Sequence, residues 1–139
     1  MRLLGRTLAF CSAIRIWISL AQRNDQDKDH PYQVIAYPIA DGEPVLICRL
    51  CVVAWSIDGK YMQLQFGGRA HGLQTYLLPV RRGSGLPDLP PGGLLGPEDV
   101  KASAKSVLLP VDADSVVGRE KYSYTRYTIR RNIYRVPIP

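Results

Sequence analysis

The sequence predicts a mainly β protein, a small antiparallel barrel or sandwich with one short helix. Three observations favour this class. Short apolar or alternating runs recur along the 139 residues. Two Asp-Gly pairs, Asp41-Gly42 and Asp58-Gly59, each lie between strand-like runs. They indicate hairpins, because tight hairpin turns need residues that accept positive φ. Twelve glycines and eleven prolines favour turns over long helices.

Residues 1–24 contain four arginines and no acid. In the run IRIWISL at 14–20, isoleucine or leucine alternates with other residues, and this period of two indicates a strand with its isoleucine face toward the core. An organelle transit peptide is the alternative, because such leaders are rich in arginine and poor in acids. We expect residues 1–24 to be a basic strand or a transit peptide, and residues 25–139 to be a single β-rich domain.

The run from Val45 to Phe66 predicts the central hairpin. It consists of a long apolar strand to Trp55, the Asp58-Gly59 turn and a shorter return strand. The turn sets a register that places three apolar pairs on the core side: Trp55 with Met62, Val53 with Leu64, and Cys51 with Phe66. The other face of the same hairpin pairs Ala54 with Gln63 and Val52 with Gln65.

Strands are also predicted on both sides of this hairpin. The run Tyr32–Ile39 predicts a strand, and Asp41-Gly42 predicts a turn after it that leads into Val45. Pro38 and Pro44 lack amide donors, so we expect its pairing to be short or at a sheet edge. A glycine-rich loop at 67–72 leads to a further strand, Leu73–Val80. Together these segments predict a meander of about four strands.

The second half of the chain is less regular. Residues 83–96 are rich in glycine and proline and predict a long, flexible surface loop. Pro97, followed by two acids, opens a helix predicted over 97–106, because proline suits the first helical position and acids suit the positive end of the helix dipole. Asp112–Glu120 is expected to be a polar turn. Further strands are expected at Val107–Val111, Tyr122–Ile129 and Asn132–Val136.

This order of elements has two natural closures. Meander strands, a linker with a helix and two final strands are compatible with an OB-like barrel, and an SH3-like barrel is equally allowed.

Catalytic and metal sites are not predicted. Cys48 and Cys51 form a CxxC pair, but inside a strand two residues three apart point to opposite faces, so we expect buried small apolar side chains. A zinc site would need a second ligand pair at suitable spacing, which the sequence lacks. His71 has no catalytic partner at a recognisable spacing. We therefore expect a protein that is not an enzyme and has no cofactor.

Arg49 is predicted to share the core face of the central hairpin. A buried guanidinium needs paired acceptors, so we expect Arg49 to lie beyond the return strand with its head in solvent. A functional contact with an anion at that place is the alternative.

The C-terminal strand is the predicted binding surface. Tyrosine rings can stack on bases and arginines can neutralise phosphates, which is what binding to single strands requires. There are two alternatives. In the first, the tyrosines are ordinary strand residues and the arginines are solvated or protect a sheet edge. In the second, the strand is a surface for protein partners. The predicted nucleic-acid-binding residues are Arg81, Arg82, Tyr122, Tyr124, Arg126, Tyr127, Arg130, Arg131 and Arg135.

The net charge of +6 suits an anionic partner. We expect a small basic module that binds RNA or single-stranded DNA. The alternative is a structural subunit of a larger assembly, such as a virion component or an accessory subunit of an organellar or other complex, and homo-oligomerisation stays open. Three cysteines suit an intracellular, reducing compartment. The cytoplasm is favoured, or the mitochondrion if residues 1–24 are a transit peptide. No apolar run reaches the roughly 18 residues of a membrane span.

Overall fold

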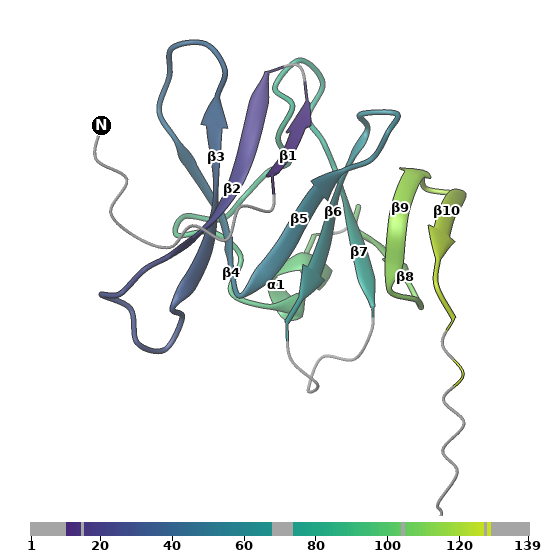
Figure 1. Ribbon diagram of the computed structural model, residues 1–139. Coiled ribbons are helices and arrows are strands. Elements are labelled where there is room, and N and C mark those ends of the chain that lie inside the picture. Colours follow the sequence, from purple (N-terminus) through teal and green to yellow (C-terminus); the bar gives the residue numbers. More distant parts are fainter. Residues whose placement is uncertain (1–10, 15, 68–73, 104, 127, 129–139) are drawn as a thin grey trace, which may run out of the picture.

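The computed structural model describes residues 11–14, 16–67, 74–103, 105–126 and 128. Its fold is mainly β, with three antiparallel sheets and one short helix, which confirms the predicted class (Figure 1). The described residues form open sheets and not a closed barrel. No helix among them is long and apolar enough to cross a membrane.

In the described part of the chain, ten strands are distributed over the three sheets in simple antiparallel order. Sheet A consists of β1 (Cys11–Ile14), β2 (Trp17–Arg23), β3 (Tyr32–Pro38) and β4 (Val45–Arg49). Sheet B consists of β5 (Cys51–Trp55), β6 (Tyr61–Phe66), β7 (Thr75–Pro79) and β8 (Val107–Leu109). A separate two-stranded ribbon consists of β9 (Ala113–Gly118) and β10 (Lys121–Tyr124).

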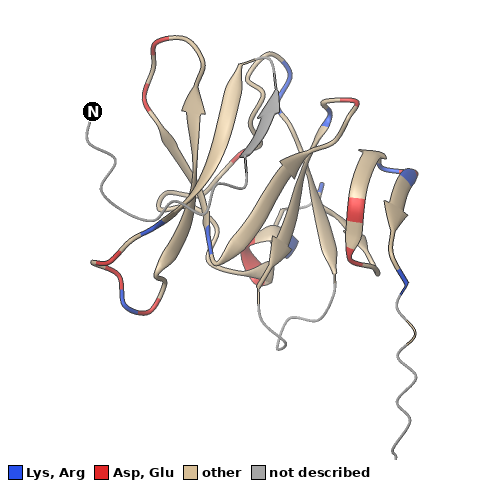
Figure 2. Cartoon of the chain, in the orientation of Figure 1, with Lys and Arg blue, Asp and Glu red and all other residues tan. Residues whose placement is uncertain are grey.

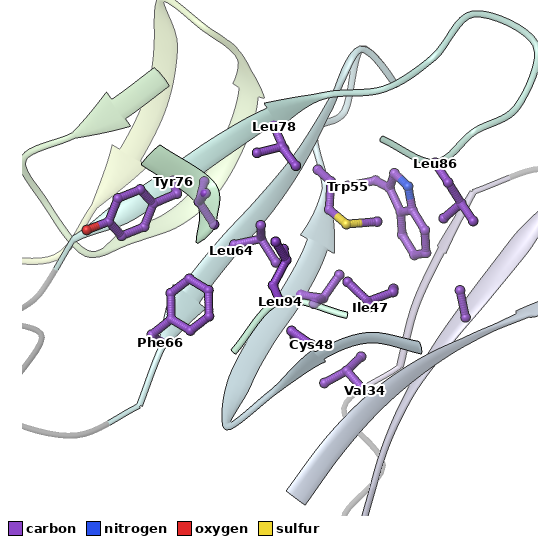
Figure 3. Packing of buried hydrophobic residues seen from close by; sticks show 14 residues of the cluster. Val34, Ile47, Cys48, Trp55, Leu64, Phe66, Tyr76, Leu78, Leu86 and Leu94 are labelled. Carbon is purple, nitrogen blue, oxygen red and sulfur yellow. The ribbon is translucent and has the colours of Figure 1, made fainter. Parts of the chain in front are cut away.

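The main core lies between sheets A and B. The predicted register of the β5–β6 hairpin is confirmed in all five pairs, from Cys51 opposite Phe66 to Trp55 opposite Met62. Its inner side chains meet Val34 and Ile47 from sheet A, as Figure 3 shows. Leu64 is fully buried among them. The Asp-Gly turn therefore predicts the residues that form the centre of the fold.

The predicted strand from Val45 to Trp55 is broken at Leu50. Leu50 has φ 53°, and in the described residues it is the one non-glycine residue with positive φ. The chain bends there and passes from sheet A to sheet B. This bend brings Cys48 and Cys51 together as a disulfide with a Cα–Cα distance of 6.1 Å. The prediction that the two cysteines face opposite sides is wrong, because it assumed one unbroken strand.

The N-terminal strand prediction is right in type but wrong in its facing. The run at 14–20 belongs to two strands, since β1 and β2 pair across a tight reversal in which Ile14 lies opposite Trp17. On β2 the side chains against the core are Trp17 and Ala21, and Ser19 between them is buried. Ile16 in the turn is 43% exposed. The Trp17 indole, with the smaller Ser19 and Ala21 beside it, faces the core in place of the isoleucine side chains that were expected there.

The β3–β4 hairpin reverses through residues 39–44, which include Asp41-Gly42 but form a longer loop than the predicted two-residue turn. Pro38 ends β3, the registered pairs stop at Ala36 opposite Val45, and β4 is an edge strand of its sheet, as the prolines predict. The outer edge of β4 is covered by Leu94, which forms a parallel bridge with Cys48. The amide of Leu94 donates to Ile47 O at 2.8 Å. A single loop residue therefore satisfies part of this exposed edge.

The proline- and glycine-rich loop at 83–96 contributes to the core. Leu86 is 6% exposed and Leu94 is 1% exposed, so the prediction of a surface loop is wrong for these leucines. Gly93 approaches the β4 backbone so closely that an added Cβ would lie 3.0 Å from Ile47 O. Pro87 is buried as well, whereas Pro90, Pro91 and Leu95 are exposed, and periodicity alone does not predict such packing.

The helix and the last strands are shorter than predicted. Helix α1 (Pro97–Lys101) begins at the predicted proline, but it ends five residues before the expected Ser106. Strand β8 ends at Leu109 and β10 at Tyr124. The predicted strand 132–136 lies outside the described residues.

The prediction of a polar turn at 112–120 is wrong, because β9 covers the second face of sheet B. Ala113 and Val116 pack against Leu77 and Leu109 in a second core. The second face of sheet B is therefore covered in part, and the ribbon β9–β10 lies beside it (Figure 1).

Candidate functional site

A surface hollow of about 1150 Å³, which we call the basic groove, lies at one end of sheet B. Three segments line it: Ile16 in the β1–β2 turn, the β5–β6 turn at 55–60, and the segment 80–85 that follows β7. Val80 connects two of them, because its amide donates to Lys60 O at 2.9 Å. The groove therefore forms where two turns and one loop meet at the same end of the fold.

The β5–β6 turn presents Lys60 to the groove and uses Asp58 internally. Asp58 Oδ1 accepts the hydroxyl of Ser56 at 2.6 Å and the amide of Lys60 at 3.0 Å. Gly59 has φ 70°, the left-handed conformation that the Asp-Gly signal predicts. The aspartate stabilises the turn backbone. In the described chain, the ammonium group of Lys60 has no ion pair.

Two adjacent arginines supply most of the positive charge. Arg81 contacts Asp88 at 3.3 Å, but both side chains are well exposed, so this pair is weak. Within the described ranges, Arg82 forms no ion pair. Arg81 and Arg82 also line a second hollow of about 250 Å³, to which Lys105 contributes. The groove and this hollow share both arginines in their lining.

Two tryptophans hold the 80–85 segment in place. Trp55 Nε1 donates to Gly85 O at 2.9 Å, and Trp17 Nε1 donates to Ser84 O at 2.7 Å. The Trp55 side chain is buried and offers little ring surface to a ligand. The exposed apolar surface at the groove comes from Ile57, which is 72% exposed, and from Ile16. The indoles therefore position the arginines, while the isoleucines form an apolar rim.

The tyrosines of β10 form a second cluster. The rings of Tyr122 and Tyr124 lie 6.5 Å apart at 39°. Tyr122 packs partly against the second core, whereas Tyr124 is 52% exposed. Arg126 follows as an exposed cation. The predicted strand face is interrupted by register shifts on both sides of Tyr122 and Ser123, so the regular alternation expected to Ile129 ends early.

The predicted site residues lie at two ends of sheet B. Tyr124 pairs with Ala113, whose amide bonds to Thr75 at the start of β7. Arg81 and Arg82 come after the other end of β7. At about 3.3 Å per residue, the length of this strand separates them from Tyr124 by roughly 20 Å. Four further predicted residues lie outside the described part of the chain: Tyr127, Arg130, Arg131 and Arg135.

The ribbon β9–β10 connects the two ends. The amides of Ile57 and Asp58 donate to Val116 O and Val117 O, each at 2.9 Å. Gly118 follows, and an added Cβ there would lie 2.6 Å from Asp58 Oδ2, so a larger residue would force the Asp58 carboxylate to move. The β9–β10 turn, with its exposed cations Arg119 and Lys121, is thereby brought next to the β5–β6 turn of the groove.

Sequence reasoning missed the contribution of three cations to this surface: Lys60, Arg119 and Lys121. The position of Lys60 directly after the Asp58-Gly59 turn could have placed it at a sheet end. The other two flank a turn that the sequence does not indicate, because 112–120 reads as polar and irregular.

Arg49 does not have its head in solvent as predicted. Its Nη1 pairs with Asp27 Oδ2, and both side chains are about three-quarters buried. The amide of His30 donates to Asp27 at 3.0 Å, and this bond, with the charges of His30 and Arg49, holds the pKa of Asp27 below its usual 3.8. Arg49 Nε is buried without a hydrogen-bond partner in the described chain. The pair ties the polar loop after β2 to the end of β4 and is a structural contact.

The described residues contain no group of three or more metal-ligating side chains. His71 lies outside them. The chain matches no model of a known protein family, no curated protein and no solved structure.

Proposed function

We propose that this protein binds single-stranded nucleic acid, RNA or single-stranded DNA, along a path from the basic groove over the β9–β10 turn to the exposed tyrosine of β10. The observation that carries the proposal is the set of exposed cations along this path, of which Lys60 and Arg82 have no ion pair in the described chain. Figure 2 shows blue positions at the β5–β6 turn and at the β9–β10 turn, with red positions at the first of these turns and on β9.

The chemistry of the path suits a flexible polyanion better than a rigid duplex. Cations at intervals neutralise phosphates, and an exposed ring such as Tyr124 offers a stacking surface to an unpaired base. The separation of roughly 20 Å between the groove and Tyr124 corresponds to a short oligonucleotide, within the 4–16 nucleotides that small β modules typically cover. Binding is therefore expected to be strongly salt-dependent and weakly sequence-dependent.

Removing the two groove arginines is expected to weaken binding. For the double variant Arg81→Ala/Arg82→Ala, loss of two phosphate contacts should reduce the slope of log K against log[salt] by about 1.4, or ~0.7 per contact on a single strand. At roughly 0.1 M salt this corresponds to a loss of about 20-fold in affinity. Fluorescence anisotropy with a labelled oligonucleotide, titrated at several salt concentrations, measures both quantities.

A control with the same change in net charge is Arg23→Ala/Lys28→Ala. Both residues are exposed and lie at or beyond the end of β2, away from the groove. If this control lowers affinity and slope as much as the groove variant does, the effect comes from net charge alone, and the proposed site is wrong.

Replacing the exposed tyrosine tests the other end of the path. Tyr124→Ala is expected to weaken oligonucleotide binding by about 1–3 kcal/mol, the value of one base stacked on an aromatic ring, while the salt slope stays unchanged. Tyr32→Ala is the matched control, since Tyr32 is 44% exposed but lies on sheet A. Equal effects of the two substitutions in the same anisotropy assay would contradict a stacking role for Tyr124.

An assembly role is the second candidate, and the apolar rim of the groove favours it. Ile57 is 72% exposed beside the cations, a combination that suits an acidic, apolar segment of a partner protein. If no oligonucleotide binds even at low salt, while light scattering shows a stable oligomer or complex, this candidate replaces the first.

A further inference from the structure

The Cys48–Cys51 disulfide lies at the corner where the chain leaves sheet A for sheet B. Cys48 is the fourth residue of β4, and Cys51 is the first residue of β5. Two residues separate them, and one of these is Leu50 in its left-handed conformation. The nucleic-acid path described above does not include this corner, so its chemistry is a separate question.

The corner is held by backbone hydrogen bonds that do not depend on the disulfide. The amide of Leu50 donates to Tyr32 O at 3.1 Å, and Leu50 O accepts the amide of Gly67 at 2.9 Å. The amide of Arg49 donates to Leu94 O at 3.0 Å. Because these bonds fix the backbone on both sides of Leu50, the two sulfurs remain neighbours when the disulfide opens. A pair that stays close in both states can open and close without unfolding the protein.

The two cysteines differ in access to solvent. Cys48 is fully buried in the main core, whereas Cys51 is only half-buried. Figure 3 shows Cys48 among the core side chains beside Ile47 and Val34. Thiol exchange requires an external thiol or disulfide to reach one sulfur, so the external partner meets Cys51. Cys48 reacts only from inside the protein.

We propose that Cys48 and Cys51 form a reversible thiol–disulfide exchange site for a small thiol such as glutathione, with Cys51 as the exchanging sulfur and Cys48 as the resolving sulfur. This site goes beyond the proposed nucleic-acid binding and is independent of it.

Oxidation proceeds in two exchange steps. The Cys51 thiolate attacks one sulfur of glutathione disulfide, so that a Cys51–glutathione bond forms, the glutathione S–S bond breaks and one glutathione thiolate leaves. The Cys48 thiolate then attacks Cys51 Sγ, which forms the protein disulfide and releases the second glutathione. The two cysteine protons pass to the two glutathione thiolates. The cysteine pair loses two electrons, which reduce the glutathione disulfide.

The test is a redox titration of the full chain in its native state. The protein carries Cys11→Ser to remove the third thiol, is equilibrated in glutathione buffers from fully reducing to fully oxidising, and is then alkylated. Mass spectrometry of the peptides around Cys48 and Cys51 is expected to show both thiols alkylated at the reducing end and neither at the oxidising end. The expected transition between them is two-electron and is reversed by returning the sample to reducing buffer.

Single substitutions then test the direction of exchange. In glutathione disulfide, Cys48→Ser is expected to accumulate about ten-fold more glutathione adduct, at Cys51, than Cys51→Ser does at Cys48, because only Cys51 is accessible. Equal adduct on both variants would overturn the assignment of Cys51 as the exchanging sulfur. Two free thiols throughout the titration, or a disulfide that opens only in denaturant, would overturn the reversible site. This outcome is read from the protein that keeps both Cys48 and Cys51, so it does not depend on whether a single variant folds.

Discussion

The Leu64→Ala variant is expected to lose about 3–4 kcal/mol of unfolding free energy, which is a large fraction of the stability of a small domain. Leu64 is fully buried at the centre of β6, opposite Val53 on one side and Tyr76 on the other. Its side chain lies in the core that sheets A and B share. Truncation there removes apolar contacts of both sheets and leaves a cavity that neighbours held in two ladders cannot close.

Urea denaturation, followed by tryptophan fluorescence, measures this loss. Val52→Ala is the matched control, because Val52 lies on the other face of the same hairpin and is 48% exposed. We expect this control to change stability by no more than about 0.5–1 kcal/mol. If both variants unfold at the same urea concentration, the β5–β6 register or the position of the core between the sheets is wrong.

The part of the fold that the sequence predicts best is the part that local chemistry determines. Asp58-Gly59 sets one turn, that turn sets the β5–β6 register, and the register determines which side chains reach the core. The same reasoning places Pro97 at the start of helix α1. In each case a residue restricts its own backbone, so its neighbours in sequence are sufficient for the prediction.

The failures have one physical cause, which is that tertiary contacts override local preference. Leucine disfavours positive φ, so no local signal marks Leu50 as the corner between the sheets. It is held there because its amide donates to Tyr32 O and its carbonyl accepts the amide of Gly67. The disulfide between Cys48 and Cys51 depends on that corner and was missed with it. The loop leucines Leu86 and Leu94 are buried for the same reason, since the gap they fill exists only when both sheets are in place.

The candidate site likewise has a part that the local sequence predicts and a part that depends on tertiary contacts. Arg81 and Arg82 were predicted as an extension of the basic surface of the C-terminal strand, on the condition that the strand from Leu73 lies near it. The position of these arginines beside Lys60 depends on the pairing of β6 with β7. Arg119 joins the same surface only because residues 113–118, whose sequence predicts a turn, form the strand β9. Composition can thus predict that a basic surface exists. Which cations lie next to one another on it depends on which strands pair.

Thr75→Val is the substitution expected to affect that ribbon most. Thr75 is fully buried, and its hydroxyl accepts the amide of Ala113 at 2.9 Å and donates to Val111 O at 2.9 Å. Gln65 Nε2 also donates to this hydroxyl, at 3.0 Å. Valine has nearly the same shape, so packing is kept while a buried amide and a carbonyl lose their partner. The expected loss of stability is about 2–4 kcal/mol, because unsatisfied buried polar groups retain their full desolvation penalty.

Thr75→Ser separates the hydrogen bonds from the packing. Serine keeps the hydroxyl and removes one methyl group, so the expected loss is only about 1 kcal/mol. Amide hydrogen exchange at Ala113 gives the local measurement: exchange should accelerate strongly in the valine variant and little in the serine variant. If serine destabilises as much as valine, or if Ala113 remains equally protected in both, the hydroxyl does not hold β9 to sheet B. The ribbon that carries Arg119 and Tyr124 would then be anchored by its other contacts, which are the backbone bonds from Ile57 and Asp58 and the packing of Val116 in the second core.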